Sequence, residues 1–178
     1  YKSDKSLVNQ RQIDQSTKSF PNALRAALRE DPDIILVGEM RDPETIQLAL
    51  TAAETGHLVF STLHTNNAYE SINRILDVFP DGSKGLATSL LSSGLSAVVS
   101  QKLVPLKEGA GRYPIHEILV STNAVRNLIR EDSIPQIYSM IQTGRQHGMQ
   151  TMLESAEAAI AKGIIDPNIL DVLKPTKE

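Results

Sequence analysis

The sequence predicts an α/β fold with a parallel sheet, followed by a small all-helical region. Two short apolar runs, Ile34 to Val37 and Leu58 to Leu63, are typical of strands, and a helical pattern lies between them. Aliphatic runs of this kind fit strands that are buried on both faces of a parallel sheet. After residue 121 the pattern changes to consecutive short helices. We therefore expect an α/β part over residues 1–121 and a helical part over residues 122–178.

Local signals place further elements on either side of these two strands. In chain order they predict a strand over Leu7 to Ile13, helices capped by Ser19, by Asp42 and by Asn66 or Asn67, and a longer helix within Asp81 to Leu103. Side chains of Ser, Asp and Asn accept hydrogen bonds from the free N–H groups that begin a helix. Pro43 follows Asp42 and is favoured at a first helical position. Strands and helices therefore alternate, which indicates a parallel α/β layer.

The remaining residues predict a hairpin and four short helices. The hairpin has its turn at Lys107 to Arg112, between two short strands, and the second strand covers Tyr113 to Val120. The predicted helices cover Ala124 to Glu131, Ile134 to Gln142, Met152 to Lys162 and Asp166 to Leu173. Apolar residues recur at helical spacing in these segments, which is typical of helices with one buried face.

Composition narrows the function classes. The 178 residues are 40% hydrophobic and 22% charged, which is ordinary for a globular domain. A net charge of −3, from 18 basic and 21 acidic residues, gives no electrostatic reason to expect nucleic acid as a partner. No cysteine is present, which excludes disulfides and thiolate zinc sites within this sequence. No apolar stretch is long enough for a membrane span.

Reactive side chains follow both predicted strands. Glu39 comes directly after Gly38 at the end of the first strand, and His64 ends the second. Because ligands in open α/β sheets bind outside the carboxyl ends of the strands, we expect Glu39 and His64 to lie near one ligand. Glu39 suits a water bound to Mg²⁺, His64 suits a hydrogen bond to a phosphate, and Thr62 and Thr65 add hydroxyls. The pattern indicates a nucleotide-hydrolysing sheet.

Two strings of sequence carry a resemblance to a known family. DPDIILVGEMRD (31–42) and GHLVFSTLHTNNA (56–68) resemble the Walker B and His boxes of secretion-type ATPases. AVRNLIRE, TGRQHGMQTM and VNQRQI are similar to segments of the type IV pilus retraction (twitching motility, PilT-like) branch. The missing cysteines agree with that branch, because many extension and secretion relatives carry a tetracysteine zinc insert. The resemblance implies a partial RecA-like P-loop NTPase sheet that uses ATP and Mg²⁺.

One motif of such enzymes does not occur in this sequence. No G-x-x-x-x-G-K-[ST] phosphate loop (Walker A) is present, and that loop supplies the backbone cradle and the Lys that grip the phosphates. In the resembled family the loop lies upstream of the Walker B box. We therefore expect the chain to be the C-terminal part of a retraction ATPase, with an incomplete nucleotide site and negligible activity alone.

The resemblance also implies roles for individual residues. Glu39 and His64 would be catalytic, and both would bind the nucleotide together with Thr62 and Thr65. Glu39 would hold Mg²⁺, through water. For Arg41 two interpretations stay open: it pairs with a carboxylate or with a neighbouring subunit, or it is an ordinary surface residue.

Two arginines, Arg126 and Arg130, share one helix face because they are four residues apart. From pattern alone this face is a solvated basic surface. The resemblance adds an output role, in which the helix relays the nucleotide state to the pilus machinery.

The implied assembly is a homo-hexamer at the cytoplasmic face of the inner membrane. It would contact the pilus platform protein, be peripheral to the membrane at most and bind no nucleic acid. Two alternatives remain open from the sequence. The chain is a non-enzymatic module that docks on a ring neighbour or on the platform, or it is a fragment of a type II secretion or pilus extension ATPase.

Overall fold

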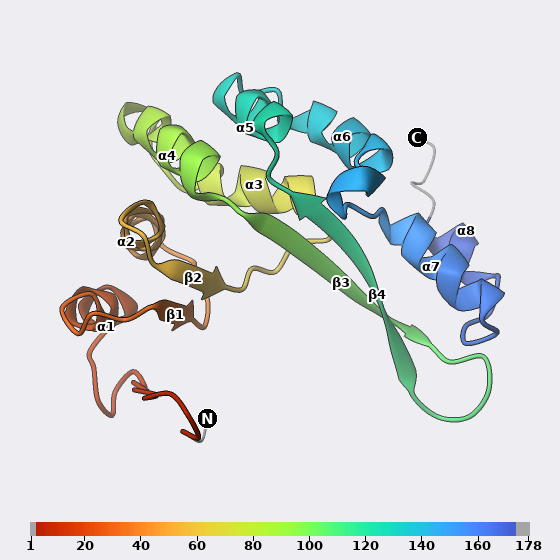
Figure 1. The fold of residues 1–178 in the computed structure, drawn as a ribbon, viewed down its shortest axis with the longest axis horizontal. Helices are drawn as coiled ribbons and strands as arrows, with labels where there is room; N and C mark the ends of the chain where they lie inside the picture. Colours follow the sequence, from red (N-terminus) through yellow and green to blue (C-terminus); the bar gives the residue numbers. More distant parts are fainter. Residues whose placement is uncertain (1–2, 174–178) are drawn as a thin grey trace. The chain divides into compact units, whose positions relative to one another are not determined.

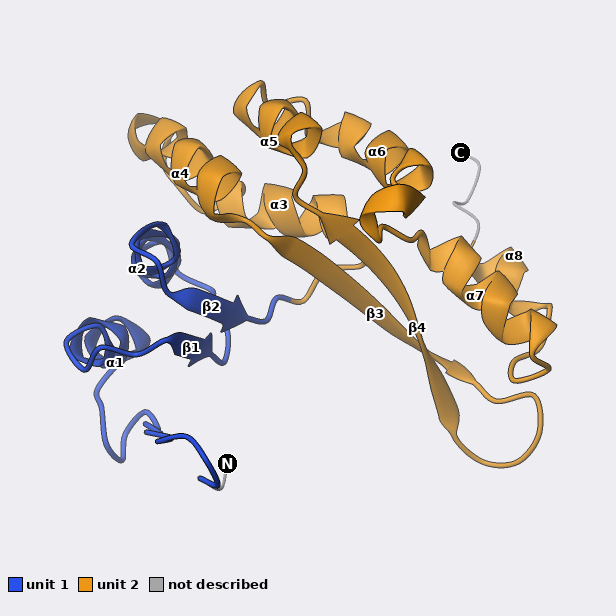
Figure 2. Ribbon diagram, viewed as in Figure 1, with its two compact units in different colours: residues 1–63 blue, residues 64–178 orange. Residues whose placement is uncertain are grey.

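A computed structural model describes residues 3–173 of the chain. It contains two compact units, residues 1–63 and residues 64–178 (Figure 2). Each unit has a two-stranded sheet of its own. The predicted division between residues 121 and 122 stays a prediction. Within the described residues, no helix combines the length and the apolar character that a membrane span requires.

The first unit packs two helices against a parallel pair of strands. Its elements are α1 (Phe20–Ala27), β1 (Ile34–Val37), α2 (Pro43–Glu54) and β2 (Leu58–Ser61) (Figure 1). In the parallel register, Ile34 lies opposite Leu58 and Val37 lies opposite Ser61. Helix α1 contacts β1, and α2 contacts β2. The core of this unit is formed by Leu24, Ile35, Val37, Ala49 and Ala52.

The predicted caps of this unit are confirmed. The side chain of Ser19 accepts a hydrogen bond from the backbone N–H of Asn22, and Asp42 accepts one from the backbone N–H of Thr45. The Thr45 hydroxyl donates a second bond to Asp42, at 2.6 Å. Helix α2 stops before Gly56, whose φ of +104° favours glycine. The segment that carries Glu39 is therefore held between the end of β1 and a well-capped helix.

The cap of α2 predicts a pH-dependent stability. Burial alone raises the pKa of Asp42, but hydrogen bonds from Thr45 and nearby backbone N–H groups outweigh it, and the pKa is lowered overall. A lowered folded-state pKa contributes stability that is present above the ordinary aspartate range of about 3.9 and is lost as pH falls through the folded value. We expect Asp42→Ala to cost about 1 kcal/mol of unfolding free energy at pH 7, measured by urea denaturation. Asp42→Asn keeps a capping oxygen, so it is expected to retain most of the stability and to lose this acid dependence. Identical acid profiles for Asp42→Asn and the unsubstituted chain would contradict the assignment.

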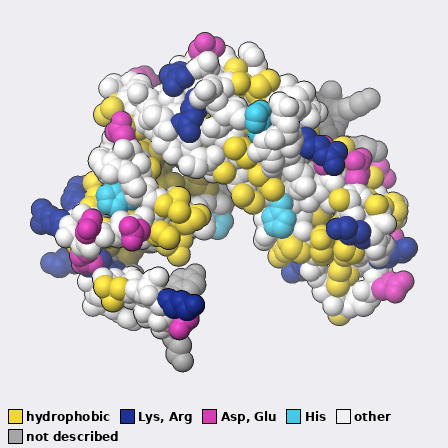
Figure 3. Space-filling model, in the orientation of Figure 1, with side chains coloured by type: hydrophobic (Ala, Val, Ile, Leu, Met, Phe, Trp, Pro, Cys, Tyr) yellow, Lys and Arg dark blue, Asp and Glu magenta, His cyan; other side chains and the backbone are white. Residues whose placement is uncertain are grey.

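The sheet of the first unit is buried on one face and exposed on the other. Ile35 and Val37 are buried, whereas Ile34 is 61% exposed and Leu36 is 56% exposed. On β2, Leu58 and Phe60 are also exposed, and they lie opposite Ile34 and Leu36. The prediction of strands buried on both faces is therefore wrong for the described residues. Successive side chains of a strand point to opposite faces, and α1 and α2 cover only one of them. Figure 3 shows hydrophobic side chains among the polar ones on the visible surface.

The predicted strand over Leu7–Ile13 is wrong. Ile13 makes only an isolated bridge with Thr17, and the residues before it have no strand partner among the described residues. The segment is held by side chains instead, because Asn9 and Arg11 both contact the carboxylate of Glu30.

The second unit is a long antiparallel hairpin with helices packed against it. Its elements are α3 (Ala68–Asp77), α4 (Asp81–Gly94), β3 (Ala97–Pro105), β4 (Arg112–Val120), α5 (Asn123–Arg130), η1 (Ile134–Gln136), α6 (Ile137–Thr143), η2 (Arg145–His147), α7 (Met152–Ala161) and α8 (Ile169–Leu173). Asn67, rather than Asn66, caps α3. The hairpin strands have nine residues each, and the second begins one residue earlier than predicted, at Arg112. The helix predicted within residues 81–103 therefore ends at Gly94, because β3 takes the residues from Ala97.

The core of the second unit lies between the hairpin and its helices. Helices α3, α6 and α7 all contact β4, and α8 packs on α7 (Figure 1). The far part of this core contains Val104, Ile115, Met152, Ala156, Ala159 and Ile165. The backbone of Gln150 bridges to Ile118 and so extends the edge of β4. Helix α7 begins with a capping box of Thr151 and Glu154. Helices occur in all four predicted C-terminal segments, but the second segment begins with the 3₁₀ helix η1, and the last helix begins at Ile169 rather than at Asp166.

Candidate functional site

The carboxyl ends of β1 and β2 are joined by a side-chain hydrogen bond. The hydroxyl of Thr62, just after β2, donates to the carbonyl oxygen of Gly38, just after β1, at 2.5 Å. Because the strands are parallel, Glu39 and Thr62 leave the sheet at the same edge. This edge is where open α/β sheets bind their ligands.

Glu39 is paired with the nearby guanidinium of Arg41. The Nε atom of Arg41 lies 2.5 Å from Oε1 of Glu39. The Arg41 side chain is 77% exposed, whereas Glu39 is 24% exposed. The hydrogen bond and the negative charge of Glu39 raise the pKa of Arg41. The carboxylate partner predicted for Arg41 is therefore present within the chain. A pair with so exposed a guanidinium is easily exchanged for another contact.

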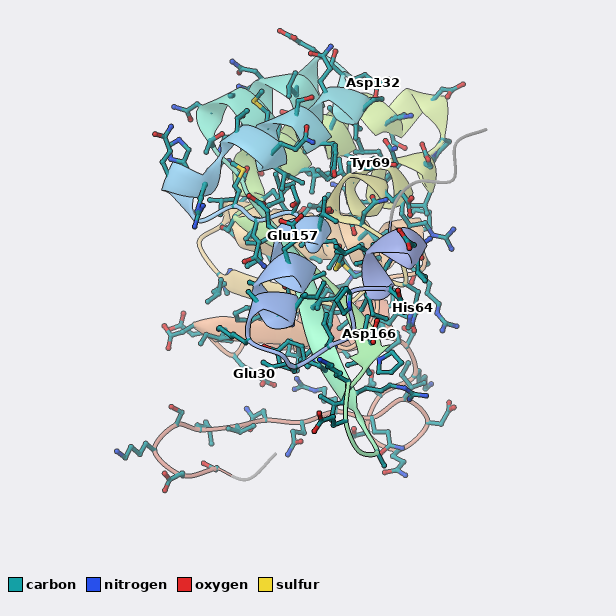
Figure 4. The ribbon with its side chains drawn as sticks, turned by 90° about the vertical axis from the view of Figure 1, so that its right-hand side faces the viewer. Glu30, His64, Tyr69, Asp132, Glu157 and Asp166 are labelled. Atoms are coloured by element: carbon teal, nitrogen blue, oxygen red, sulfur yellow. The ribbon has the colours of Figure 1, made fainter. Side chains whose placement is uncertain are left out.

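His64 begins the second unit and lines an open cavity of about 250 Å³. The other residues that line it are Thr65, Asn66, Glu70, Asn73, Arg74 and Asp77. Figure 4 labels His64, which comes from the loop before α3, and Tyr69, which lies in the first turn of that helix. The cavity therefore follows the exposed side of α3 and combines two basic side chains, His64 and Arg74, with carboxylates.

The loop that carries His64 is held by hydrogen bonds to the start of α3. The hydroxyls of Thr65 and Ser71 lie 2.6 Å apart. The backbone N–H of Asn66 donates to a carboxylate oxygen of Glu70 at 3.2 Å. Thr65 thus lies beside His64, as predicted, but its hydroxyl already has one partner.

The structure tests part of the predicted constellation. It joins Thr62 to the strand end that precedes Glu39, and it brings Thr65 into the same cavity as His64. Glu39 and His64 belong to different units, so their convergence on one ligand stays a prediction.

Arg126 has a different environment from the one predicted by pattern. It is half-buried, and its guanidinium donates to the backbone carbonyl oxygens of Ser92, Ser93 and Leu95, at the C-terminal end of α4. A solvated surface position is therefore wrong for Arg126. Arg130 is exposed and contacts the side chain of Asn127, so that interpretation holds for it. Arg126 serves α4, whose last carbonyl groups lack partners within the helix.

Sequence reasoning missed two residues near the candidate site. Arg74 lines the cavity with His64, and Glu117 on β4 contacts the start of α3. A signal for Arg74 existed, because the apolar residues Ile72, Ile75 and Leu76 place it on the outer side of α3. No signal in the sequence pointed to Glu117, since its partner lies 49 residues away in the chain.

The described residues could contribute one ligand to a Mg²⁺ site, but they do not form a complete site. No group of three His, Cys, Asp or Glu side chains among residues 3–173 could hold a metal ion. Mg²⁺ commonly keeps several waters and binds through one or two carboxylates together with substrate phosphates. Glu39 suits such a contact through water, and it does not form a complete metal site.

The comparison with protein families identifies the chain. A family model described as type II/IV secretion system protein matches residues 3–109. The chain belongs to the type II/IV secretion system protein family. This membership confirms the superfamily that the Walker B-like and His-box-like strings indicated.

Relatives in this family agree with the resemblance to the retraction branch. The chain is 59% identical over 167 residues to a twitching motility protein of Neisseria gonorrhoeae, covering 94% of this chain and 45% of that protein. It is 58% identical over 165 residues to the type IV pilus retractation ATPase PilT of Pseudomonas aeruginosa, covering 93% and 48%. The chain thus spans about half the length of these curated relatives.

Solved structures of the family share the fold. The crystal structure of the pilus retraction motor PilT with bound ADP matches with a TM-score of 0.86 and 47% identity, over 98% of this chain and 49% of that one. The ATPase DotB of Legionella pneumophila matches with a TM-score of 0.84 and 31% identity, over 97% and 46%. The predicted α/β class is confirmed.

Proposed function

We propose that this chain forms the Walker B and His-box part of an ATP-hydrolysing motor that drives type IV pilus retraction. The observation that carries the proposal is the match, over 98% of the chain, to a pilus retraction motor with bound ADP. The identities of 59% and 58% to retraction relatives support it.

Glu39 would act on the attacking water. A carboxylate at the end of β1 can accept a hydrogen bond from a water placed in line with the γ-phosphate. Its pairing with Arg41 orients the carboxylate without burying it. Thr62 would fix the backbone at Gly38, directly before Glu39. Mg²⁺ on the phosphates would neutralise charge, and Glu39 would contact one of its waters.

His64 would report the γ-phosphate to the second unit. Its ring can donate a hydrogen bond to a phosphate oxygen, and Arg74 adds positive charge to the same cavity. Thr65, bound to Ser71, would hold the loop in the orientation that this contact needs. The start of α3 follows directly, so a change at His64 reaches the helix.

The motor would work as a homo-hexamer at the cytoplasmic face of the inner membrane, in contact with the pilus platform protein. Arg126 ties α5 to the end of α4, so the two helices would move together as an output element. Arg130 lies on the exposed side of α5 and is free of such a backbone role. During the cycle, the guanidinium of Arg41 would leave the carboxylate of Glu39 and contact a neighbouring subunit.

The decisive experiment is ATP turnover by two proteins. One is this 178-residue chain, and the other is the same chain joined to an upstream half that carries a phosphate loop, here called the joined protein. We expect negligible turnover by the chain alone, because no residue replaces the backbone cradle and the Lys of that loop. We expect Mg²⁺-dependent turnover by the joined protein. A joined protein that folds and assembles but hydrolyses no ATP would overturn the proposal.

A second candidate is a non-enzymatic module that docks on a ring neighbour or on the platform protein. The absence of a phosphate loop from these 178 residues favours it for the chain by itself. Retention of the platform protein by the chain, without any turnover in the joined protein, would support it. A type II secretion or pilus extension role is separated by substitutions in α5, scored for retraction against secretion.

A further inference from the structure

Glu117 is a buried carboxylate with a specific partner. It lies on β4, and only 3% of it is exposed. Its Oε1 atom accepts a hydrogen bond from the backbone N–H of Ala68, at 2.8 Å. Ala68 is fully buried, so its N–H has no access to water. A buried backbone N–H needs a partner within the protein, and Glu117 supplies it.

This partner completes the start of α3. The first N–H groups of a helix have no acceptors within the helix. Asn67 serves the N–H of Glu70, and Glu117 serves that of Ala68. The N-terminal end of a helix also carries a partial positive charge, which favours a nearby carboxylate. Glu117 therefore holds α3 by both geometry and charge.

The contact fixes one end of the His64 loop. That loop covers residues 64–67, and the hydrogen bonds that Thr65 and Asn66 make within it go to residues of α3 itself. These local bonds shape the loop but do not place it on the sheet. Glu117 comes from the hairpin, 49 residues later in the chain. It ties the loop and α3 to the strand on which α6 and α7 pack.

Glu117 also interacts electrostatically with groups of the C-terminal helices. Burial, followed by the negative charges of Glu117 and Glu154 and by Tyr69, raises the pKa of Tyr138 on α6. Groups from α3, β4, α6 and α7 therefore interact electrostatically around Glu117. This is a junction between the loop with His64 and the C-terminal helices.

We propose that Glu117 is a positioning residue for His64, because it fixes the start of α3 on the hairpin and thereby the loop that His64 belongs to. The inference rests on the proposed function for the role of His64 toward the nucleotide. Glu117 itself touches no reacting group.

The first test uses NMR on the 178-residue chain and needs no nucleotide. Glu117→Asp keeps the charge but is one methylene too short to reach Ala68, whereas Glu117→Gln keeps an acceptor at full length. We expect the Asp variant to lose the hydrogen-exchange protection of the Ala68 amide and to shift the ring resonances of His64. The Gln variant is expected to retain both. Ser155→Ala is the matched control, because Ser155 accepts a hydrogen bond from the backbone N–H of His116, the residue before Glu117 on β4.

The second test measures steady-state kinetics in the joined protein. We expect Glu117→Asp to lower kcat about 10- to 100-fold with KM for ATP unchanged, since misplacing a reacting contact by about 1 Å has effects of that size. Glu117→Gln restores kcat, and Ser155→Ala leaves it unchanged. Unaltered His64 resonances and kcat in a folded Asp variant, or equal losses in Asp and Gln, would overturn this inference. Lack of turnover in the unsubstituted joined protein would instead count against the proposed function.

Discussion

Glu39→Gln is expected to lower kcat for ATP in the joined protein by about 10²- to 10⁴-fold, the usual contribution of a positioned acid or base. Gln has the size of Glu but cannot take a proton from water or attract it with a full charge. The side chain lies at the end of β1 and is 24% exposed, and because Gln fills the same space the substitution leaves no cavity. Nucleotide affinity is expected to change little, because the phosphate loop supplies the main grip.

The matched control for this prediction is Glu54→Gln. Glu54 is an exposed residue at the last position of α2, in the same unit and far along the helix from its cap. It is expected to leave kcat and KM unchanged. Single-turnover hydrolysis, with the enzyme in excess over ATP, separates chemistry from product release. If Glu39→Gln hydrolyses ATP at the rate of the Glu54→Gln control, Glu39 has no role in the chemical step.

Arg126→Ala is expected to cost about 2 kcal/mol of unfolding free energy. The guanidinium donates to three backbone carbonyl groups at the end of α4, and hydrogen bonds from charged groups contribute about 1.5–3 kcal/mol. The cation also opposes the partial negative charge at that helix end. Arg126→Lys is expected to recover only part of the loss, because an ammonium cannot reach three acceptors in a fixed plane.

Arg130→Ala provides the comparison within the same helix. Arg130 is exposed and donates a hydrogen bond to the side chain of Asn127, so its removal is expected to change the unfolding free energy by less than about 0.5 kcal/mol. Urea denaturation of the two variants measures the difference. Equal stability of Arg126→Ala and Arg130→Ala would mean that the contacts to α4 contribute nothing.

Local chemistry explains which parts of the fold the sequence predicted well. Ser19, Asp42 and Asn67 cap helices because a short polar side chain followed by a helical apolar pattern determines a start point by itself. The strand at Ile34 to Val37 was equally clear, because four consecutive aliphatic residues have no helical periodicity. These signals depend on neighbours in the chain, so one sequence suffices to read them.

Features that depend on distant partners were less predictable. Burial of β1 on both faces was expected from its composition, yet Ile34 and Leu36 are exposed, because burial depends on which elements cover each face. Arg126 has the spacing of a surface residue, and only the packing of α5 beside α4 gives it three carbonyl partners. The segment before Ile13 has strand-like residues but pairs with no strand within residues 3–173.

In the candidate site, too, residues marked by local sequence were predicted and residues that depend on distant partners were not. Glu39 and His64 were predicted from their positions at strand ends, and their role at one ligand stays a prediction. The hydrogen bond between Thr62 and Gly38 joins the ends of the two strands. Glu117 was not found, because the contact between β4 and α3 exists only after the hairpin and the helix have packed.

The central claim, that Glu39 and His64 serve one triphosphate, is tested most directly by a double-mutant cycle on kcat in the joined protein. Glu39→Gln, His64→Ala and the double variant are compared with the unsubstituted enzyme. Residues that act as a unit have strongly non-additive effects, so we predict a double variant about as slow as the slower single variant. Losses that simply multiply, or a His64→Ala enzyme with unchanged kcat, would contradict the claim.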